Sequence, residues 1–174
     1  PERCPLLNWW QRLIASATPL PIGQVGGQNK IGKRSTNLME NRLYSDLAYL
    51  WPVISPPEEY AEEAGYWRRA LWDRLGPGEH RILELGVGGG HNLSHLTSDF
   101  WATAVDISPQ MLALSMKLNP GVQHHLGDMR SVRLGWTFDG VLIHDAISYM
   151  LTEGDLRATF ATAKIHLRRG GVLL

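Results

Sequence analysis

The feature that most constrains this chain is a glycine-rich loop that directly follows an apolar run. Residues 82–90 read ILELGVGGG, with Glu84 inside the apolar run and Gly86, Gly88 and Gly90 at every second position after it. A short apolar run of this kind is typical of a buried parallel strand. Glycines just beyond the strand let the backbone turn tightly and approach a ligand with no Cβ in the way. The pattern predicts a loop that holds a nucleotide-type cofactor.

The spacing of the glycines argues against two common cofactors. A dinucleotide fingerprint needs G-x-G-x-x-G, because its third glycine lets the following helix pack close to the strand. Counted from Gly86 and Gly88 the third position is His91, and counted from Gly88 and Gly90 it is Leu93. The lysine of a phosphate-binding P-loop is also missing. The loop is therefore expected to bind neither NAD nor a nucleoside triphosphate in the usual way.

The loop and four later segments resemble the class I S-adenosylmethionine-dependent methyltransferases. The first motif of that family is an apolar strand, an acidic residue and G-x-G-x-G, which Glu84 and the three glycines match. The later segments, in the expected order, are AVDIS (104–108), LGDMRS (126–131), TFDGVLIHDAISYM (137–150) and LRRGGVLL (167–174). The resemblance covers roughly residues 37–174. It implies an α/β fold with a Rossmann-like, doubly wound parallel sheet, S-adenosyl-L-methionine as cofactor and methyltransferase activity.

Asp106 ends the apolar run of the second expected strand. An acidic side chain at this strand tip can accept hydrogen bonds from the ribose hydroxyls of a nucleotide cofactor. The alternative is that Asp106 begins a turn or helps to cap the helix opened by Ser108 and Pro109, since Ser is a good N-cap and Pro suits the first helical position. The resemblance adds Ile107 to the cofactor-binding residues.

The resemblance also implies roles for Asp128, Met129 and Tyr44. Asp128 follows the third apolar run, where the family places a carboxylate facing the adenine amino group and Met129 lining the ring. A solvated turn aspartate is the alternative. Tyr44 matches the tyrosine that related small-molecule enzymes fold over the cofactor as a lid. Alternatively, it packs in a hydrophobic face with neighbouring leucines, namely Leu43, Leu47 and Leu50.

Acceptor chemistry is expected after the fourth strand, because ligands of open α/β sheets bind beyond the carboxyl ends of the strands. His144 and Asp145 are expected to end that strand, and Tyr149 follows them. His144 is the first candidate for a general base, since imidazole titrates near neutral pH. A structural histidine at a strand tip is the alternative. Tyr149 is the second candidate catalytic residue. His144 is also expected among the cofactor-binding residues, and Asp145 either orients the acceptor or binds the methionine end of the cofactor.

The other histidines do not predict a metal site. His91 and His95 stand at positions i and i+4, which suits a zinc pair, but no third ligand and no intervening Glu complete such a pattern. His124 and His125 are adjacent in an expected strand, so their side chains point to opposite faces. They are expected to be structural or exposed.

The chain divides into three parts. Residues 1–36 are expected to form a poorly structured extension, 37–80 a helical lid and 81–174 the cofactor-binding core. Helices are expected at 37–51 and 58–75, and strands near 81–87, 102–107, 122–127, 138–145 and 170–174. Thr152 with Asp155 three residues on predicts the start of the last helix. Because the family fold usually continues past the fifth strand, the core is expected to lack its last strands, and residues 1–38 are expected to be extraneous.

Composition sets the remaining expectations. Seventeen basic and seventeen acidic residues cancel among 174, so net charge does not favour nucleic acid or anionic lipid as a partner. No apolar stretch approaches the roughly 20 residues that a membrane helix needs. The single cysteine, Cys4, permits no internal disulfide, which fits a reducing, cytoplasmic setting. We therefore expect neither a nucleic-acid nor a membrane partner.

The methyl acceptor is expected to be a small molecule. The fourth strand is followed by HDAI and not by the Asn/Asp-Pro-Pro-Tyr/Phe motif of nucleic-acid and protein-amide methyltransferases. The segment order looks most like amino-sugar N-methyltransferases, although those enzymes carry a histidine near the position of Tyr149. Two hypotheses follow. One is a small-molecule N- or O-methyltransferase, and the other is a cofactor-binding fragment or partner-dependent module without activity of its own.

Overall fold

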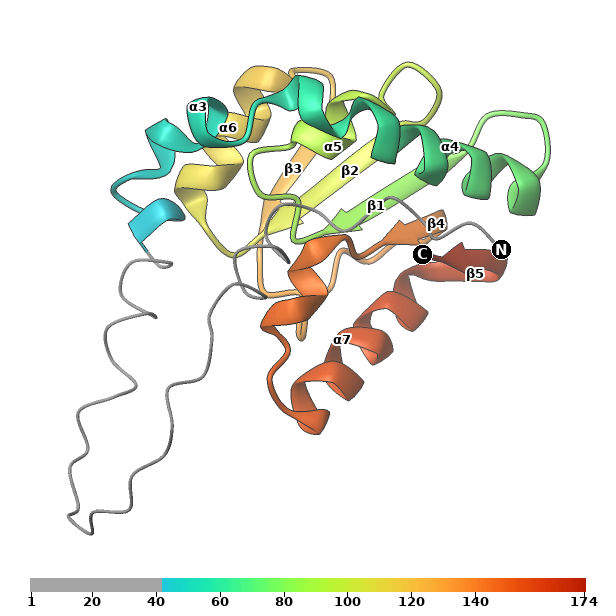
Figure 1. The fold of residues 1–174 in the computed structure, drawn as a ribbon. Helices are drawn as coiled ribbons and strands as arrows, with labels where there is room; N and C mark the ends of the chain where they lie inside the picture. Colours follow the sequence, from blue (N-terminus) through green and yellow to red (C-terminus); the bar gives the residue numbers. More distant parts are fainter. Residues whose placement is uncertain (1–41) are drawn as a thin grey trace, which may run out of the picture. The chain divides into compact units, whose positions relative to one another are not determined.

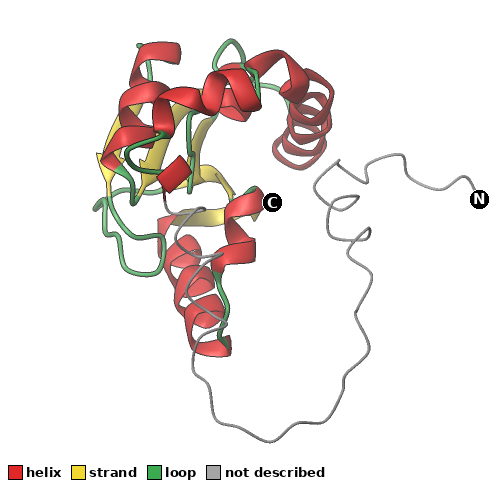
Figure 2. Cartoon of the chain, turned by 60° about the vertical axis from the view of Figure 1, so that its left-hand side comes forward, coloured by secondary structure: helices red, strands yellow, loops and turns green. Residues whose placement is uncertain are grey.

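The computed structural model of the protein describes residues 42–174, which build one five-stranded parallel sheet with the strand order β3-β2-β1-β4-β5. Helices cover both faces of the sheet (Figures 1 and 2). The strands are β1 Arg81–Leu85, β2 Trp101–Asp106, β3 Gln123–Leu126, β4 Phe138–Leu142 and β5 Leu167–Leu173. The expected Rossmann-like, doubly wound sheet is confirmed.

Short helices alternate with these strands. They are η1 Ala48–Leu50, α3 Trp51–Ile54, η2 Pro57–Tyr60, α4 Ala61–Leu75, α5 His91–Ser94, α6 Pro109–Leu118, η3 Asp145–Tyr149 and α7 Glu153–His166. The expected helix starts are confirmed for α6 and α7. The Ser108 side chain accepts a hydrogen bond from the Met111 N–H, and Thr152 accepts one from the Asp155 N–H. Each cap satisfies a backbone donor that the first helical turn leaves unpaired.

Several expected boundaries were wrong. The expected helix 37–51 is not continuous, because its described part consists mainly of turns and η1, and α3 then starts at Trp51 with Pro52 in its first turn. Proline suits that position but not a helix interior. β4 ends at Leu142, so His144 and Asp145 lie beyond the strand. β5 begins at Leu167, three residues early, across a register shift opposite β4.

The core has two halves, one on each face of the sheet. Alternate residues of β1 point to opposite faces, so Ile82 packs under α4, α5 and α6 while Leu83 packs on the α7 side. Glu84 shares the face of Ile82. The same alternation therefore places this acidic residue beneath the helical layer that contains α4 and the glycine loop.

The expectations for residues 1–36, and for 1–38 as an extraneous segment, lie outside the described residues. Among residues 42–174, none of the helices combines the length and apolar character needed to cross a membrane.

Candidate functional site

The glycine loop has a backbone that only glycine adopts easily. Gly86, Gly88 and Gly90 have φ angles of 81°, 56° and 76°, in the left-handed region. Gly90 is also crowded, since a Cβ there would lie 2.3 Å from Ser115 Oγ and 2.4 Å from Asn119 Nδ2. Asn119 donates a hydrogen bond of 3.0 Å to the Gly90 carbonyl. The loop is thus fixed against α6.

Gly86 brings the loop against the segments that follow β3 and β4. A Cβ at Gly86 would lie 2.3 Å from the Ala146 Cβ, in η3, and 2.9 Å from the Met129 Cε. Met129, expected to line the adenine ring, therefore lies directly against the first glycine. Gly86, Met129 and Ala146 therefore lie in contact just beyond the ends of three strands. A larger side chain at position 86 would disrupt this contact.

Asp106 fastens the loop to the start of α6. Its Oδ2 accepts a hydrogen bond from the Gly88 N–H at 2.7 Å, and its Oδ1 accepts one from the Ser108 N–H at 2.8 Å. The side chain is nearly buried, and burial raises the pKa of Asp106 above its usual value despite these hydrogen bonds. The turn and helix-start contacts weighed as an alternative are present. Ribose binding stays a prediction, as does the role of Ile107, which is 65% exposed beside Asp106.

Asp128 is paired with Arg130. Both carboxylate oxygens accept hydrogen bonds from the Arg130 guanidinium, and Arg130 also binds Asp155 at 2.7 Å. The contact with Arg130 lowers the pKa of Asp128. Adenine recognition by Asp128 stays a prediction, and the structure adds that this carboxylate is held in place by an arginine.

The tyrosines Tyr44 and Tyr149 meet. Their hydroxyl oxygens lie 2.6 Å apart and their rings pack edge to face. Tyr44 also contacts the Trp51 ring, and its backbone carbonyl accepts a hydrogen bond from the Ser108 hydroxyl. The expected lid residue and one expected catalytic residue thus join the segment before η1 to η3.

Glu84 is a buried carboxyl group with an unsatisfied oxygen atom. The residue is 2% exposed, and its Oε2 has no hydrogen-bond partner among residues 42–174. Burial raises the pKa of Glu84 to about 7. In the first turn after the loop, the Asn92 side-chain amide lies close enough to Glu84 to lower its pKa, yet it makes no hydrogen bond of good geometry and is likewise buried without a partner. In the same turn, the His91 Nδ1 is also buried without a partner. Buried polar groups are normally hydrogen-bonded, so this cluster calls for a ligand.

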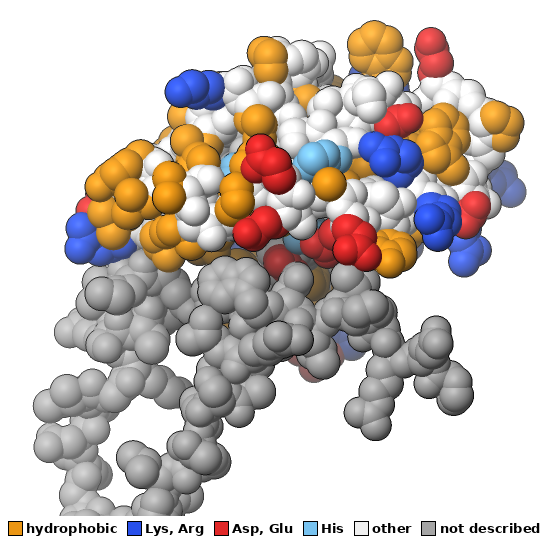
Figure 3. Space-filling model, turned by 45° about the horizontal axis from the view of Figure 1, so that its top comes forward, with side chains coloured by type: hydrophobic (Ala, Val, Ile, Leu, Met, Phe, Trp, Pro, Cys, Tyr) orange, Lys and Arg blue, Asp and Glu red, His pale blue; other side chains and the backbone are white. Residues whose placement is uncertain are grey.

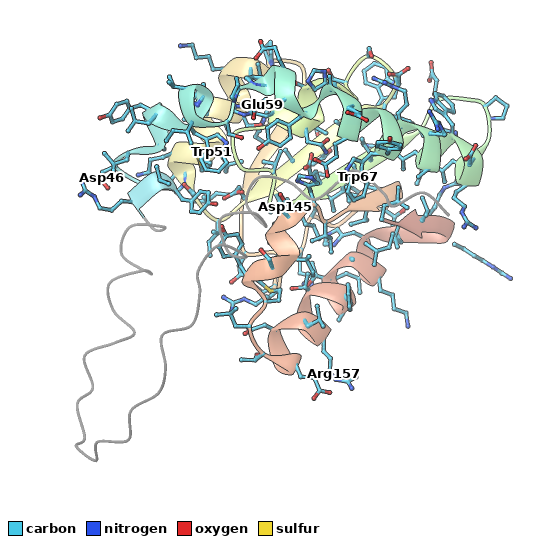
Figure 4. All side chains as sticks on the ribbon, viewed as in Figure 1. Asp46, Trp51, Glu59, Trp67, Asp145 and Arg157 are labelled. Carbon is cyan, nitrogen blue, oxygen red and sulfur yellow. The ribbon has the colours of Figure 1, made fainter. Side chains whose placement is uncertain are left out.

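His144 points to the α4 side of the site. Its Nε2 lies 2.8 Å from Oε1 of Glu63, and its ring packs edge-on against Tyr60 and Trp67. Burial lowers the pKa of His144, but Glu63 and Asp145 outweigh burial and raise it above its usual value. Figure 4 labels Asp145 at the start of η3 and Trp67 on α4. In Figure 3, acidic side chains gather near histidine on this face.

Glu63 was not a candidate in the sequence. It stands 81 positions before His144, in α4 next to Glu62, and no spacing rule links Glu63 to His144. The only local signal was its place near the start of a helix expected to cover the site. Its partner became apparent only from the packing of α4 on the sheet.

The remaining histidines make separate contacts. His95 bonds the Pro57 carbonyl at 2.8 Å, while the buried His91 packs against the Tyr60 ring. His124 bonds the Ser115 hydroxyl, and His125 contacts a tryptophan ring. In the described part of the chain, no three His, Cys, Asp or Glu side chains gather as metal ligands.

The residues present fit S-adenosylmethionine. Its amino-acid end carries an ammonium and a carboxylate group, which complement the unpaired carboxylate oxygen of Glu84 and the unpaired amide of Asn92. Its adenosine end needs a hydrogen-bond acceptor for ribose and apolar contacts for the base, and Asp106, Ile107 and Met129 stand together at the ends of β2 and β3. The glycine loop lies between the two groups.

Comparison with known proteins agrees with this fit. A family model described as a methyltransferase domain matches residues 82–171, just over half of the chain. A dTDP-3-amino-3,4,6-trideoxy-alpha-D-glucopyranose N,N-dimethyltransferase of Streptomyces venezuelae is 34% identical over 119 residues, covering 67% of this chain and 50% of that protein. A Saccharopolyspora spinosa dTDP-4-amino-2,3,4,6-tetradeoxy-D-glucose N,N-dimethyltransferase is 30% identical over 116 residues, covering 66% and 46%.

Solved structures give the same result. DesVI of Streptomyces venezuelae has a TM-score of 0.63 and 31% identity, over 77% of this chain and 55% of its own. CalS10, an amino pentose methyltransferase from Micromonospora echinaspora solved with bound S-adenosylmethionine, has a TM-score of 0.63 and 29% identity, over 85% and 57%. The chain spans about half the length of the curated relatives it matches. It belongs to the class I S-adenosylmethionine-dependent methyltransferases, as its sequence predicted, and the cofactor of that family is S-adenosyl-L-methionine.

Proposed function

We propose that this chain binds S-adenosyl-L-methionine and takes part in transferring its methyl group to the amino nitrogen of a small molecule, with an amino sugar as the acceptor class. The observation that carries cofactor binding is the pair of neighbouring buried side chains, Glu84 and Asn92, whose polar atoms have no hydrogen-bond partner and which flank the glycine loop in the sequence. The acceptor class is supported by the named activities of the relatives, which are N,N-dimethyltransferases of amino sugars.

Each end of the cofactor has its own residues in this proposal. Asp106 accepts hydrogen bonds from the ribose, and Glu84 receives the ammonium group. Ile107 and Met129 would hold the adenine ring, and Asp128 would bind its amino group. Tyr44 closes the site from the segment before η1, a role supported by its contacts with Trp51 and Tyr149. Asp145 lies at the start of η3, where it can bind the acceptor or the amino-acid end of the cofactor.

The chemical step needs little from the protein besides alignment. The cofactor supplies a methyl group already activated on a sulfonium sulfur. The chain must hold the acceptor nitrogen in line with the methyl carbon, exclude water and accept a proton. His144 is proposed as the proton acceptor and Tyr149 as a contact that positions the acceptor. In an acceptor-dependent assay, His144→Gln is then expected to lower turnover about 10²- to 10⁴-fold.

Calorimetry with S-adenosylhomocysteine tests cofactor binding. Asp106→Ala removes the acceptor of two ribose hydrogen bonds, so affinity is expected to fall about tenfold or more. NAD serves as the control ligand and should not bind above background. If Asp106→Ala binds as tightly as the unmodified chain, the ribose assignment is wrong.

Methyl transfer from labelled S-adenosylmethionine tests the acceptor class. Nucleotide-linked amino sugars are compared with the matching sugars that carry a hydroxyl at the same carbon. Label is expected only in the amine. Label in the hydroxy sugars alone would replace the proposed N-methylation by O-methylation.

A second candidate function rests on the coverage of the relatives. Because the chain matches about half of their length, a cofactor-binding module that needs a further segment or partner for turnover fits the same site. Tight binding of S-adenosylhomocysteine without turnover of any acceptor in the panel would favour this candidate.

A cytoplasmic setting is part of the proposal, with neither nucleic acid nor membrane as partner. It is supported by the single cysteine and the balanced charge of the chain.

A further inference from the structure

We propose that Glu63 is a positioning residue for His144, holding the imidazole with its proton on Nε2 so that Nδ1 can take the proton lost by the acceptor nitrogen. This inference rests on the proposed function and assigns to α4 a part in the chemistry beyond covering the cofactor. Glu63 is far from His144 in the sequence and contacts it only in the folded chain. The names of the similar proteins assign no role to this residue.

The geometry of the pair carries the inference. Glu63 Oε1 lies 2.8 Å from His144 Nε2, and the two side chains are 28% and 11% exposed. The Nε2–H direction is not aligned with the oxygen, so the contact is an ion pair with an imperfect hydrogen bond. Catalytic hydrogen bonds are often poorly aligned before ligands bind and tighten afterwards.

The other ring nitrogen remains available. Within residues 42–174, no group forms a hydrogen bond with Nδ1 of His144. The edge contacts with Tyr60, from η2, and Trp67, from α4, fix the plane of the ring from the helical side. A carboxylate on one nitrogen of a histidine determines the tautomer and leaves the other nitrogen as the base.

The groups around His144 are almost all acidic. Glu63 faces it from α4, Glu84 from β1 and Asp145 from η3. The contact with His144 lowers the pKa of Glu63, so this carboxylate is ionised at neutral pH. A ring beside the ionised carboxylate of Glu63 binds a proton more strongly than a free imidazole, which suits a group that must receive a proton from a methylated ammonium.

The proposed step is a methyl transfer from sulfur to nitrogen, followed by loss of a proton from that nitrogen. The lone pair of the neutral acceptor amine forms a bond to the methyl carbon, while the carbon–sulfur bond breaks and its electron pair stays on sulfur. The new ammonium nitrogen then gives one proton to Nδ1 of His144. Glu63 stabilises the resulting imidazolium, and solvent removes the proton before the next turnover.

Nitrogen-15 NMR of histidine-labelled protein tests the inference without any acceptor. The signals of His144 are assigned by their loss in His144→Gln. In the unmodified chain, the neutral form is expected to carry its proton on Nε2. Glu63→Gln is expected to lower the pKa of His144 by about one unit or more. Glu62→Gln is the matched control, because Glu62 is the exposed neighbour on the same helix and bonds Tyr66.

The outcomes separate this inference from the proposed function. A neutral His144 protonated on Nδ1, or an equal pKa change in Glu62→Gln and Glu63→Gln, overturns the role of Glu63 even if S-adenosylhomocysteine binds. Failure of the unmodified chain to bind S-adenosylhomocysteine in calorimetry overturns the proposed function, whatever the tautomer. Glu63→Asp keeps the charge but shortens the side chain. In this variant the pKa of His144 is expected to lie between its values in Glu63→Gln and in the unmodified chain.

Discussion

Two buried carboxylates stand at the ends of neighbouring strands, and their surroundings are opposite. Asp106, at the end of β2, accepts hydrogen bonds from two backbone N–H groups. Glu84, inside β1, has an oxygen with no partner among the described residues, and burial raises its pKa to about 7. One carboxylate is used to build the loop. The other has an unpaired oxygen. Under the proposed function, the nucleoside end of the site is therefore preformed, and the amino-acid end depends on a charge partner supplied by the ligand.

The largest expected effect concerns the preformed half. Gly90→Ala adds a Cβ that would lie 2.3 Å from Ser115 Oγ, at a φ of 76°. Overpacking and a left-handed backbone together should lower the free energy of unfolding by about 2–5 kcal/mol, measured by urea denaturation. Gly121→Ala, with no atom within 4 Å of the new Cβ, is the control and should be nearly neutral. Equal stability of the two variants would mean that the loop is not held as described.

The next effect is a pH dependence of the free energy of unfolding that is caused by Glu84. Burial raises its pKa from 4.5 to about 7, so between these values the folded chain keeps a proton that the unfolded chain releases. The free energy of unfolding should therefore fall as pH rises from 4.5 to 7, by roughly 3 kcal/mol, and then level off.

Substitution of Glu84 by glutamine should remove this decline, so that Glu84→Gln is at least as stable as the unmodified chain at pH 8. Denaturation curves at a series of pH values measure it. A variant that is clearly less stable at pH 8 would show that the Glu84 carboxylate is paired in the folded chain after all.

The smallest effect on stability is expected at Asp106. In Asp106→Asn the amide nitrogen must face one of the two backbone N–H groups, leaving a buried donor unpaired at a cost of about 1–3 kcal/mol. Urea denaturation measures the loss. The comparison with Glu84 is sharpest here, because neutralising one carboxylate should destabilise the chain at pH 8 and neutralising the other should not. If Glu84→Gln were destabilised at pH 8 and Asp106→Asn were not, the assignment of the preformed half to Asp106 and of the ligand-dependent half to Glu84 would be reversed.

Much of this arrangement could be predicted from local sequence. The glycine loop and the caps at Ser108 and Thr152 depend on short-range backbone requirements, and the alternation of strands with helices indicated a parallel sheet. These features are encoded within a few residues of where they appear.

The charged half could not be predicted in the same way. The contact of Glu63 with His144 depends on how α4 packs over the ends of β1 and β4, which no spacing within the helix specifies. The absence of a partner for Glu84 is likewise a property of the packed structure. The end of β4 at Leu142, two residues before His144, places that histidine in a connection whose course is set by tertiary contacts.

Proton release on cofactor binding tests the division of the site most directly. Titration calorimetry with S-adenosylhomocysteine at pH 6.5, in buffers of different ionisation enthalpy, counts the protons exchanged. If the cofactor's ammonium group pairs with Glu84, the protonated carboxyl must ionise, and most of one proton should be released in the unmodified chain but not in Glu84→Gln. Binding without proton release, or with equal release from Glu84→Gln, would contradict the assignment of Glu84 as the partner of the cofactor's amino-acid end.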